Sequence, residues 1–326
     1  MKQQASYPIV DLHCDTMTGI SRSGGKDRLA QRAGHIDLPR LQAGGALMQC
    51  FAIFAAAQPL TPAQAPGYTP KGVFEGTYTQ YLREMDENRS QIAPVYRFGD
   101  IGQNRQAGRI SSLLTLEDGA VVHSLDDLQA LYDKGVRMLG FTWNFPNGLG
   151  NPNSPDPAAM ELGLTELGRE AVGKMESLGM VVDVSHLSDG GFWEIVRLAR
   201  KPFLASHSNA RALCPHPRNL TDPMLRALAD KGGATGLNFC SRFVDGSDYT
   251  SVEGLLRHAL HIRDVAGIEA LCLGSDFDGI DSRLEFEDYS GYPRLLAAFE
   301  KHFTPRELDL ITHGNALRVF GACMEA

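Results

Sequence analysis

The stretch IVDLHCD, residues 9–15, is an apolar segment that ends in side chains of the kind that bind metal ions. It is the first of eight short runs rich in apolar and β-branched residues, and each run is followed by a segment with helical periodicity. Strand–helix units repeated in this way predict a parallel sheet. Eight of them in 326 residues predict an α/β fold, the (β/α)8 TIM barrel. The predicted strands are residues 7–15, 46–54, 111–117, 136–143, 180–186, 202–207, 233–239 and 270–276.

Two helices have clear end signals. In residues 164–179 apolar side chains recur on one face, and Gly179 stands where a C-cap glycine belongs. The segment TPRE, residues 304–307, is a capping box with proline at the first helical position. It predicts a terminal helix that runs toward Phe320 and lies outside the barrel.

Two segments are too rich in proline, glycine and asparagine to form regular structure, residues 58–72 and 144–157. Because each follows a predicted strand, we expect both at the C-terminal face of the barrel, where loops either shape a substrate pocket or only connect elements. The length of the chain fits one barrel better than two unrelated domains, so residues 1–326 are interpreted as a single domain.

Composition excludes several classes of protein. A formal net charge of −8 argues against a nucleic-acid partner, which would need a surplus of Lys and Arg. No apolar run approaches the roughly 18 residues of a membrane span. The first residues contain no apolar signal segment and the six cysteines form no CxxC pair, which predicts a reduced, cytoplasmic protein. A homodimer is expected only because it is the commonest assembly.

Five of the eight predicted strands end in His, Asp or Glu, for which an ordinary barrel has no packing reason. The C-terminal ends of barrel strands meet on one face, so these side chains should converge there. Each of them alone would more often be a structural strand-end group. Burying the whole set is costly unless its members are paired or bind an ion, and a metal site meets that need for all of them at once. The set is His13, Asp15, Glu117, His186, His207 and Asp276.

The composition of this set predicts two metal ions. Imidazoles and carboxylates suit zinc, with manganese, cobalt or iron as alternatives. Six candidate ligands exceed the needs of one tetrahedral ion, so we expect two ions bridged by a carboxylate, for which Glu117 is the candidate. Asp276 then remains as a general base and acid. Asp278, two residues further on, is interpreted as a structural hydrogen-bonding group.

The sequence resembles the membrane dipeptidase (renal dipeptidase) family, peptidase family M19, within the amidohydrolase-like barrels. Six motifs in the same order carry the resemblance, which covers nearly the whole chain. They are DLHCDT at 11–16, LEDG at 116–119, VDVSH at 182–186, SHS at 206–208, RN at 218–219 and GSDFDG at 274–279.

This resemblance implies a binuclear zinc dipeptidase that cleaves the amide bond of small dipeptides, including those with a D-residue at the C-terminal position. It also implies that Arg218 receives the terminal carboxylate of the substrate, a role for which a guanidinium is suited. The implied ligands are His13, Asp15 and Glu117 for one zinc, and Glu117, His186 and His207 for the other.

Two positions depart from the family pattern. Trp143 stands where the mammalian enzymes have a histidine that contacts the reacting carbonyl, and an indole N–H donates one hydrogen bond but carries no charge. An aromatic hydroxyl expected at or near Cys240 is also missing. Trp143 keeps open an alternative, a barrel hydrolase of another small amide, a lactone or an ester. A non-catalytic metal-binding protein is the alternative from a different class.

Overall fold

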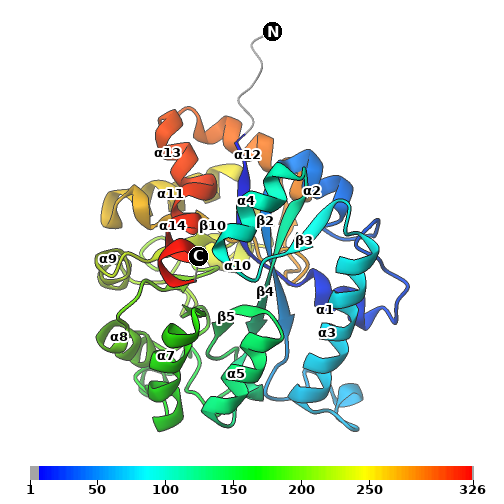
Figure 1. The fold of residues 1–326 in the computed structure, drawn as a ribbon. Coiled ribbons are helices and arrows are strands. Elements are labelled where there is room, and N and C mark those ends of the chain that lie inside the picture. The colour runs from blue at the N-terminus through cyan, green and yellow to red at the C-terminus, as the bar shows by residue number, and fades with distance from the viewer. Residues whose placement is uncertain (1–6, 325–326) are drawn as a thin grey trace.

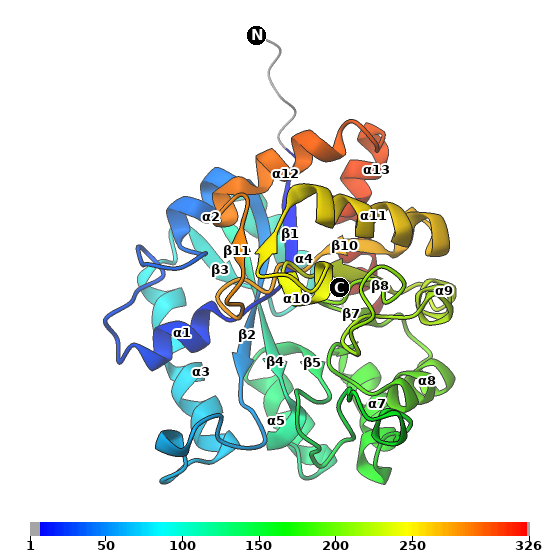
Figure 2. The ribbon, with the colours of Figure 1, turned by 180° about the vertical axis from the view of Figure 1, so that it is seen from behind.

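The computed structural model describes residues 7–324. Within them eight parallel strands close into a barrel in the order β1-β2-β4-β5-β6-β7-β8-β10, and β10 pairs with β1 (Figures 1 and 2). The predicted (β/α)8 barrel is confirmed. The barrel strands are β1 (Ile9–Cys14), β2 (Ala46–Phe54), β4 (Ile110–Glu117), β5 (Val136–Gly140), β6 (Val181–Asp183), β7 (Leu204–Ala205), β8 (Ala234–Leu237) and β10 (Leu271–Leu273).

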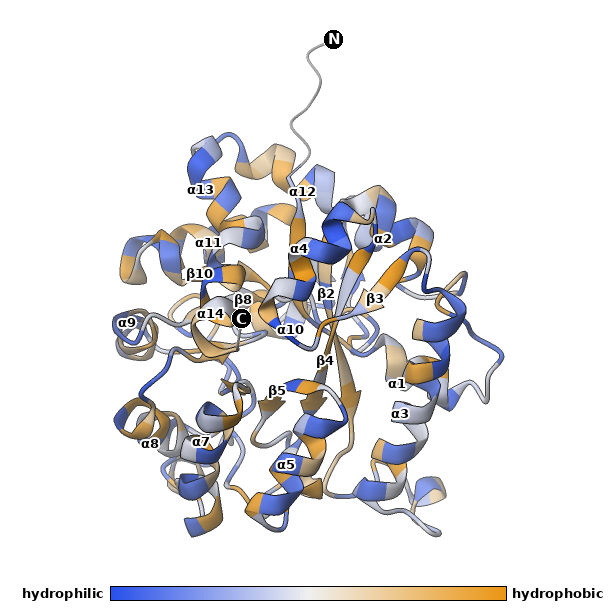
Figure 3. Ribbon diagram, in the orientation of Figure 1, coloured by the Kyte–Doolittle hydropathy of each residue, from blue (hydrophilic) through white to orange (hydrophobic). Residues whose placement is uncertain are grey.

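Helices surround these strands, and α3, α5, α7, α8, α9 and α11 form the ring visible in Figure 1. In Figure 3 these helices carry both hydrophilic and hydrophobic residues along their length, as amphipathic helices over a barrel do. The helices are α1 (Thr16–Arg22), α2 (Leu38–Gly44), α3 (Pro70–Glu87), α4 (Phe98–Gln106), α5 (Leu125–Asp133), α6 (Pro157–Met160), α7 (Glu166–Leu178), α8 (Asp189–Leu198), α9 (Asp222–Asp230), α10 (Ser241–Val244), α11 (Val252–Ala266), α12 (Tyr292–Phe299), α13 (Pro305–Asp309) and α14 (Asn315–Cys323). Three short strands lie outside the barrel order: β3 (Ile92–Pro94), which pairs in parallel with the first residues of β4, and the pair β9 (Tyr249–Thr250) and β11 (Arg283–Leu284).

The strand residues divide between two apolar layers because successive side chains point to opposite faces. The inner layer fills the barrel and takes residues from all eight of its strands, among them Val10, Met48 and Leu204. The outer layer lies between strands and helices and includes Phe51 and Leu139. Burial on both faces explains why the strands read as continuous apolar runs.

The helix signals in the sequence are confirmed, with one difference. Helix α7 begins after Thr165, whose side chain accepts a hydrogen bond from Gly168 N, and ends at Gly179 in the left-handed region (φ 81°). Thr304 and Glu307 form the predicted capping box of α13. The terminal helix is not uniform, however, since a π-helical turn at Leu310–Gly314 separates α13 from α14.

Helix α14 packs against the bottom of the barrel. Its residues Ala316, Val319 and Phe320 share the inner apolar layer with Val10 and Leu12 of β1. This shared core supports the single-domain interpretation, which remains a prediction.

The two predicted loops follow β2 and β5, and both contribute to the cleft described below. The first ends earlier than predicted. Residues 70–72 belong to α3, because Thr69 caps that helix by accepting a hydrogen bond from Gly72 N and Pro70 fits its first turn. The second loop is irregular up to the start of α6 at Pro157.

Strands β5, β6, β7, β8 and β10 end two or three residues before their predicted ends. His186, His207 and Asp276 therefore follow the strands and are not part of them. His186 (φ 68°) and Asp276 (φ 65°) adopt the left-handed region, which interrupts a strand and costs on the order of 1–3 kcal/mol for a residue other than glycine. Such strain is typical of positions held for function.

Candidate metal centre

A β-bulge aims His13 into the barrel mouth. Asp11 pairs with Gln49 and Cys14 with Phe51, so three steps along β1 match two along β2. The extra residue turns His13 to the interior, where its Nε2 lies 3.4 Å from Asp15 Oδ2. His13 and Asp15 share one side, as predicted, and Cys14 is buried on the other in the outer layer.

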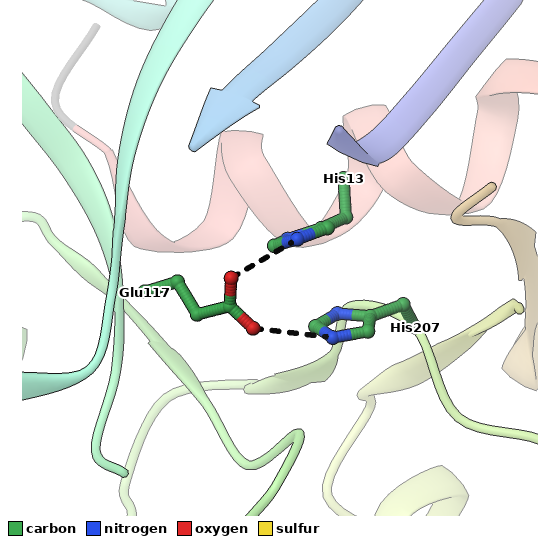
Figure 4. A group of neighbouring side chains, drawn as sticks. All are labelled: His13, Glu117 and His207. Atoms are coloured by element: carbon green, nitrogen blue, oxygen red, sulfur yellow. Dashed lines mark ion pairs between the residues drawn. The ribbon is translucent and has the colours of Figure 1, made fainter. Parts of the chain in front are cut away.

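Glu117, the last residue of β4, lies between the imidazoles. Its Oε2 is 3.5 Å from His13 Nε2, and its Oε1 is 3.0 Å from His186 Nε2 and 3.7 Å from His207 Nε2. Figure 4 shows the carboxylate between His13 and His207 with one oxygen toward each ring. One oxygen thus faces the nitrogen of His13 and the other faces those of His186 and His207, an arrangement that fits a bridging ligand.

Two of these histidines, His186 and His207, face each other with bare ring nitrogens, that is, nitrogens that carry no proton. His186 Nδ1 lies 3.1 Å from Asn144 Oδ1, which only accepts, so the ring proton is on Nδ1. His207 Nδ1 lies 2.7 Å from Ser206 Oγ, whose own proton goes to Asp183 Oδ2 at 2.5 Å. Both Nε2 atoms therefore carry lone pairs, and they lie only 3.1 Å apart.

A metal cation fits this donor set. Two lone pairs at this distance repel each other unless a cation lies within reach of both. The spacing is close to that of two nitrogens bound at about 2.0–2.1 Å to one tetrahedral zinc. His13 Nε2 and Asp15 Oδ1 are also buried and have no hydrogen-bond partner in the part of the chain that the structure describes. Buried polar atoms are rarely left so, and metal coordination would satisfy them.

The pKa values at the site are shifted by burial and by the crowding of like charges. Burial raises the pKa of Glu117 to about 7 and that of Asp276 to about 6. Burial also lowers the pKa values of His186 and His207, which keeps both rings neutral. Neutral imidazoles are the form that binds metals, and a divalent cation would return the carboxyls to their charged form.

Asp276 reaches the same centre from the loop after β10. Its Oδ1 is 3.9 Å from His13 Nε2, and its Oδ2 accepts a hydrogen bond of 2.9 Å from Asn238 Nδ2. Gly279 packs against Asp15 and Asp276 so closely that a Cβ at this position would collide with Asp15 Oδ2. The structure thus brings all six predicted residues to one mouth of the barrel.

Arg218 is a buried cation near this centre, with 4% of its surface exposed. Its Nη1 donates to Ser208 Oγ (3.2 Å) and its Nη2 to His207 O (3.1 Å), whereas its Nε has no partner. Within residues 7–324 no carboxylate forms an ion pair with it. A buried charge without a counter-ion is costly, so this guanidinium is suited to receive an anionic group.

Asp278 has the structural role predicted for it. Its carboxylate accepts hydrogen bonds from Thr16 Oγ1 (2.7 Å), Arg32 Nη1 (2.6 Å) and His35 N (2.7 Å). These contacts lower the pKa of Asp278, with the His35 hydrogen bond and the Arg32 charge outweighing burial. They tie the start of α1 and the loop before α2 to the loop after β10.

A cleft of about 1140 Å³ opens over the centre. Its floor includes Asp15, Glu117, His186 and Asp276, and Arg218 lies along it. This volume is at the upper end for ligand sites, so the cleft has room beyond a dipeptide.

One wall of the cleft is aromatic. The Trp143 ring lies 4.9 Å from Phe54 and 6.0 Å from the His186 ring, measured between centroids. Arg22 stacks on Phe54 at 5.7 Å. Trp143 therefore stands beside a candidate ligand, His186.

The model of the membrane dipeptidase family (peptidase family M19) matches residues 2–326. The chain belongs to this family. Membership makes it a metal-dependent dipeptidase by class, in agreement with the sequence motifs. Within residues 7–324 no helix has the length and apolar composition to cross a membrane.

Solved structures of similar proteins agree with the family. A dipeptidase of family M19 is 28% identical, has a TM-score of 0.88, and the match covers 98% of this chain and 100% of the other. A metallopeptidase from Rhodobacter sphaeroides, liganded with a phosphinate mimic of the dipeptide L-Ala-D-Ala, is 26% identical with a TM-score of 0.87 and coverage of 98% and 99%. A protein of the pqqA 5′ region of Klebsiella pneumoniae is 41% identical over 205 residues, which are 59% of this chain and 74% of that protein.

Sequence reasoning assigned no role to three polar side chains that contact the candidate site residues. Each lies within or close to a quoted motif or a noted residue, but nothing in the sequence tells which ring nitrogen or carboxylate oxygen it contacts. They are Asn144 at His186, Ser206 at His207, and Asn238 at Asp276.

Proposed function

We propose that this member of the family is a binuclear zinc enzyme that hydrolyses the amide bond of small dipeptides, including those with a D-residue at the C-terminal position. The observation that carries the proposal is the meeting of the bare Nε2 atoms of His186 and His207 around the Glu117 carboxylate, beside a buried arginine that has no counter-ion among residues 7–324. The Rhodobacter sphaeroides structure with its L-Ala-D-Ala mimic supports the inclusion of a D-residue.

The five ligands divide into two groups that share Glu117. Such a pair of ions supplies an activated water and polarises the carbonyl of the substrate. The division follows the two oxygens of Glu117, which face His13 on one side and the other two histidines on the other. The proposed ligands are His13, Asp15 and Glu117 for the first ion, and Glu117, His186 and His207 for the second.

The chain's own residues would orient the substrate and move the proton. Arg218 would bind the terminal carboxylate of the dipeptide with its charged fork. Asp276 is in reach of the centre and would accept the proton of the attacking water and pass it to the leaving amine. Asn238 would hold the Asp276 carboxylate in place through Oδ2, which leaves Oδ1 toward the centre.

A panel of L-L and L-D dipeptides, assayed with zinc-loaded protein, tests this function. We expect turnover that stops on removal of metal by a chelator and returns on addition of zinc. Cobalt and manganese, added separately to the same metal-free protein, would identify the preferred ion. Well-folded, zinc-loaded protein that cleaves no dipeptide in the panel would contradict the proposal.

A second candidate is hydrolysis of another small amide, a lactone or an ester, and the aromatic wall favours it. Trp143 and Phe54 present apolar surface beside His186, and the cleft exceeds a dipeptide in volume. The same panel extended to lactones and esters separates the two candidates. Turnover of these compounds that exceeds turnover of every dipeptide would favour the second.

Replacing Arg218 with Ala is expected to raise KM for free dipeptides. Losing a charged hydrogen-bond partner costs about 1.5–3 kcal/mol, roughly a 10- to 100-fold change in affinity. Because a C-terminal amide offers no charge to Arg218, KM for amidated dipeptides should change much less. Steady-state kinetics on matched free and amidated substrates measure the difference, and equal effects on both would remove Arg218 from carboxylate recognition.

A further inference from the structure

Two buried aspartates, Asp11 on β1 and Asp183 on β6, bind a neighbouring strand in the same way. In each, Oδ1 accepts two backbone N–H groups, one from the residue two positions further on and one from a serine just beyond the end of the neighbouring strand. In each, Oδ2 accepts the hydroxyl proton of that serine, Ser206 for Asp183 (2.5 Å) and Ser275 for Asp11 (2.6 Å).

We call these two hydrogen-bonded aspartate–serine pairs the Asp11 clamp and the Asp183 clamp. They differ in the next contact of the serine Oγ. Ser206 Oγ lies 2.7 Å from Nδ1 of His207. Ser275 Oγ instead accepts a hydrogen bond from Phe277 N at 3.1 Å. The serine of the Asp183 clamp therefore contacts the ring of His207, a proposed metal ligand, whereas the serine of the Asp11 clamp contacts a backbone N–H.

The proton count along this chain of hydrogen bonds fixes the tautomer of His207. Ser206 has one hydroxyl proton, and a carboxylate can only accept, so that proton belongs to the bond with Asp183 Oδ2. Ser206 Oγ then accepts Nδ1–H of His207. A neutral imidazole carries a single ring proton, so Nε2 keeps its lone pair, which faces Glu117 and His186.

We propose that Asp183 is a positioning residue which, through Ser206, keeps the ring proton of His207 on Nδ1 and leaves Nε2 free for a metal ion. The proposal rests on the proposed function in one respect, the role of His207 as a ligand. Asp183 itself does not touch the metal.

The variant Asp183→Asn is expected to reverse the direction of these hydrogen bonds. Oδ1 receives N–H groups from Ser185 and Ser206, so the amide oxygen of the variant must occupy that position. Its NH2 group then faces Ser206 Oγ and donates to it. The Ser206 hydroxyl turns to donate to His207 Nδ1, and the ring proton moves to Nε2, the nitrogen that would bind the metal.

Asp11→Asn is the matched control. Its Oδ1 also receives two backbone N–H groups, from His13 and Ser275, so the amide is forced into the same orientation. The carboxylate is buried like that of Asp183, and the variant loses the same charge. Asp11→Asn also removes a hydrogen bond from Tyr292 Oη to Asp11 Oδ2 (3.0 Å), so any loss of stability in the control should be at least as large as in Asp183→Asn. The serine of the Asp11 clamp, however, contacts no imidazole, so no tautomer should change.

Nuclear magnetic resonance of the ring nitrogens in metal-free, ¹⁵N-histidine-labelled protein reads the tautomer directly. We expect His207 to be protonated on Nδ1 in the wild type and in Asp11→Asn, and on Nε2 in Asp183→Asn. Zinc binding, measured by competition with a chelator, should weaken about 10- to 100-fold in Asp183→Asn, the usual effect of losing an outer partner of a ligand. Asp11→Asn should bind zinc much as the wild type does. Nδ1 protonation in folded Asp183→Asn, or equal zinc losses in both variants, would overturn the proposal.

Ser206 variants test the same link if Asp183→Asn does not fold. Ser206→Ala should lose zinc affinity, and Ser206→Thr, which keeps the hydroxyl, should retain it. Wild-type affinity in Ser206→Ala would overturn the proposal. Protein with the expected tautomers and zinc affinities that cleaves no dipeptide would contradict the proposed function and still support the role of Asp183.

Discussion

Replacing Asp276 with Asn is expected to lower kcat by about 10²- to 10⁴-fold, the usual contribution of a general acid–base group, while the protein keeps its metal ions. Asn has nearly the same shape and tolerates the left-handed backbone of this position (φ 65°), so the fold should not change. It cannot accept and release a proton at neutral pH. Steady-state kinetics together with metal analysis of the purified variant measure the effect.

The second aspartate of the same motif is the control for this prediction. Asp278 has the same backbone conformation, but its carboxylate binds Thr16, Arg32 and His35 and not the candidate metal ligands. Asp278→Asn should therefore lower the melting temperature and change kcat far less than Asp276→Asn does. Unchanged turnover in Asp276→Asn would reject Asp276 as the acid–base group.

Replacing Glu117 with Gln should leave fewer than two metal ions bound per chain. Activity should fall by more than 10- to 100-fold, which is the usual effect of replacing a residue that only holds a metal ligand in place. One amide oxygen cannot replace two charged carboxylate oxygens that face His13 and His186 at 3.5 and 3.0 Å. Since both ions share this ligand, we expect both to bind more weakly. Elemental analysis after dialysis against metal-free buffer gives the stoichiometry.

Asp118→Asn is the control for this prediction, because it also replaces a buried carboxyl group with an amide, at the next residue of the chain. Asp118 accepts hydrogen bonds from Ala57 N, Ala120 N and Asn147 Nδ2, so it stabilises loops and contacts none of the candidate ligands. The control should unfold at a lower temperature and still hold two ions when folded. Two tightly bound ions in Glu117→Gln would show that Glu117 does not bridge them.

Much of the candidate site follows from the sequence, because the relevant signals are local. The apolar runs locate all eight barrel strands, although five of them end two or three residues earlier than predicted. The excess of His, Asp and Glu at the ends of those runs predicts the donor set. Asp276 was distinguished from Asp278 by its place at the end of the last predicted strand and by the structural role expected of Asp278. The helical start of residues 70–72 was missed because the cap formed by Thr69 lies inside a segment whose composition is that of a loop.

The partners of the site residues did not follow from the sequence. Nothing local tells that Asn144 contacts the ring of His186, or that Arg218 is buried with no carboxylate of the described residues beside it. The bulge in β1 is equally hidden, since it appears only when β1 and β2 are paired.

The sequence by itself determined the barrel and the kinds of side chain at its mouth, since strand periodicity and residue type are properties of short segments. Only the tertiary structure decided which atoms meet: the bare nitrogens of His186 and His207 at 3.1 Å, and the link from Asp183 through Ser206 to His207. Closure of the barrel sets these distances, because it brings together strand ends that are far apart in the chain and fixes their register.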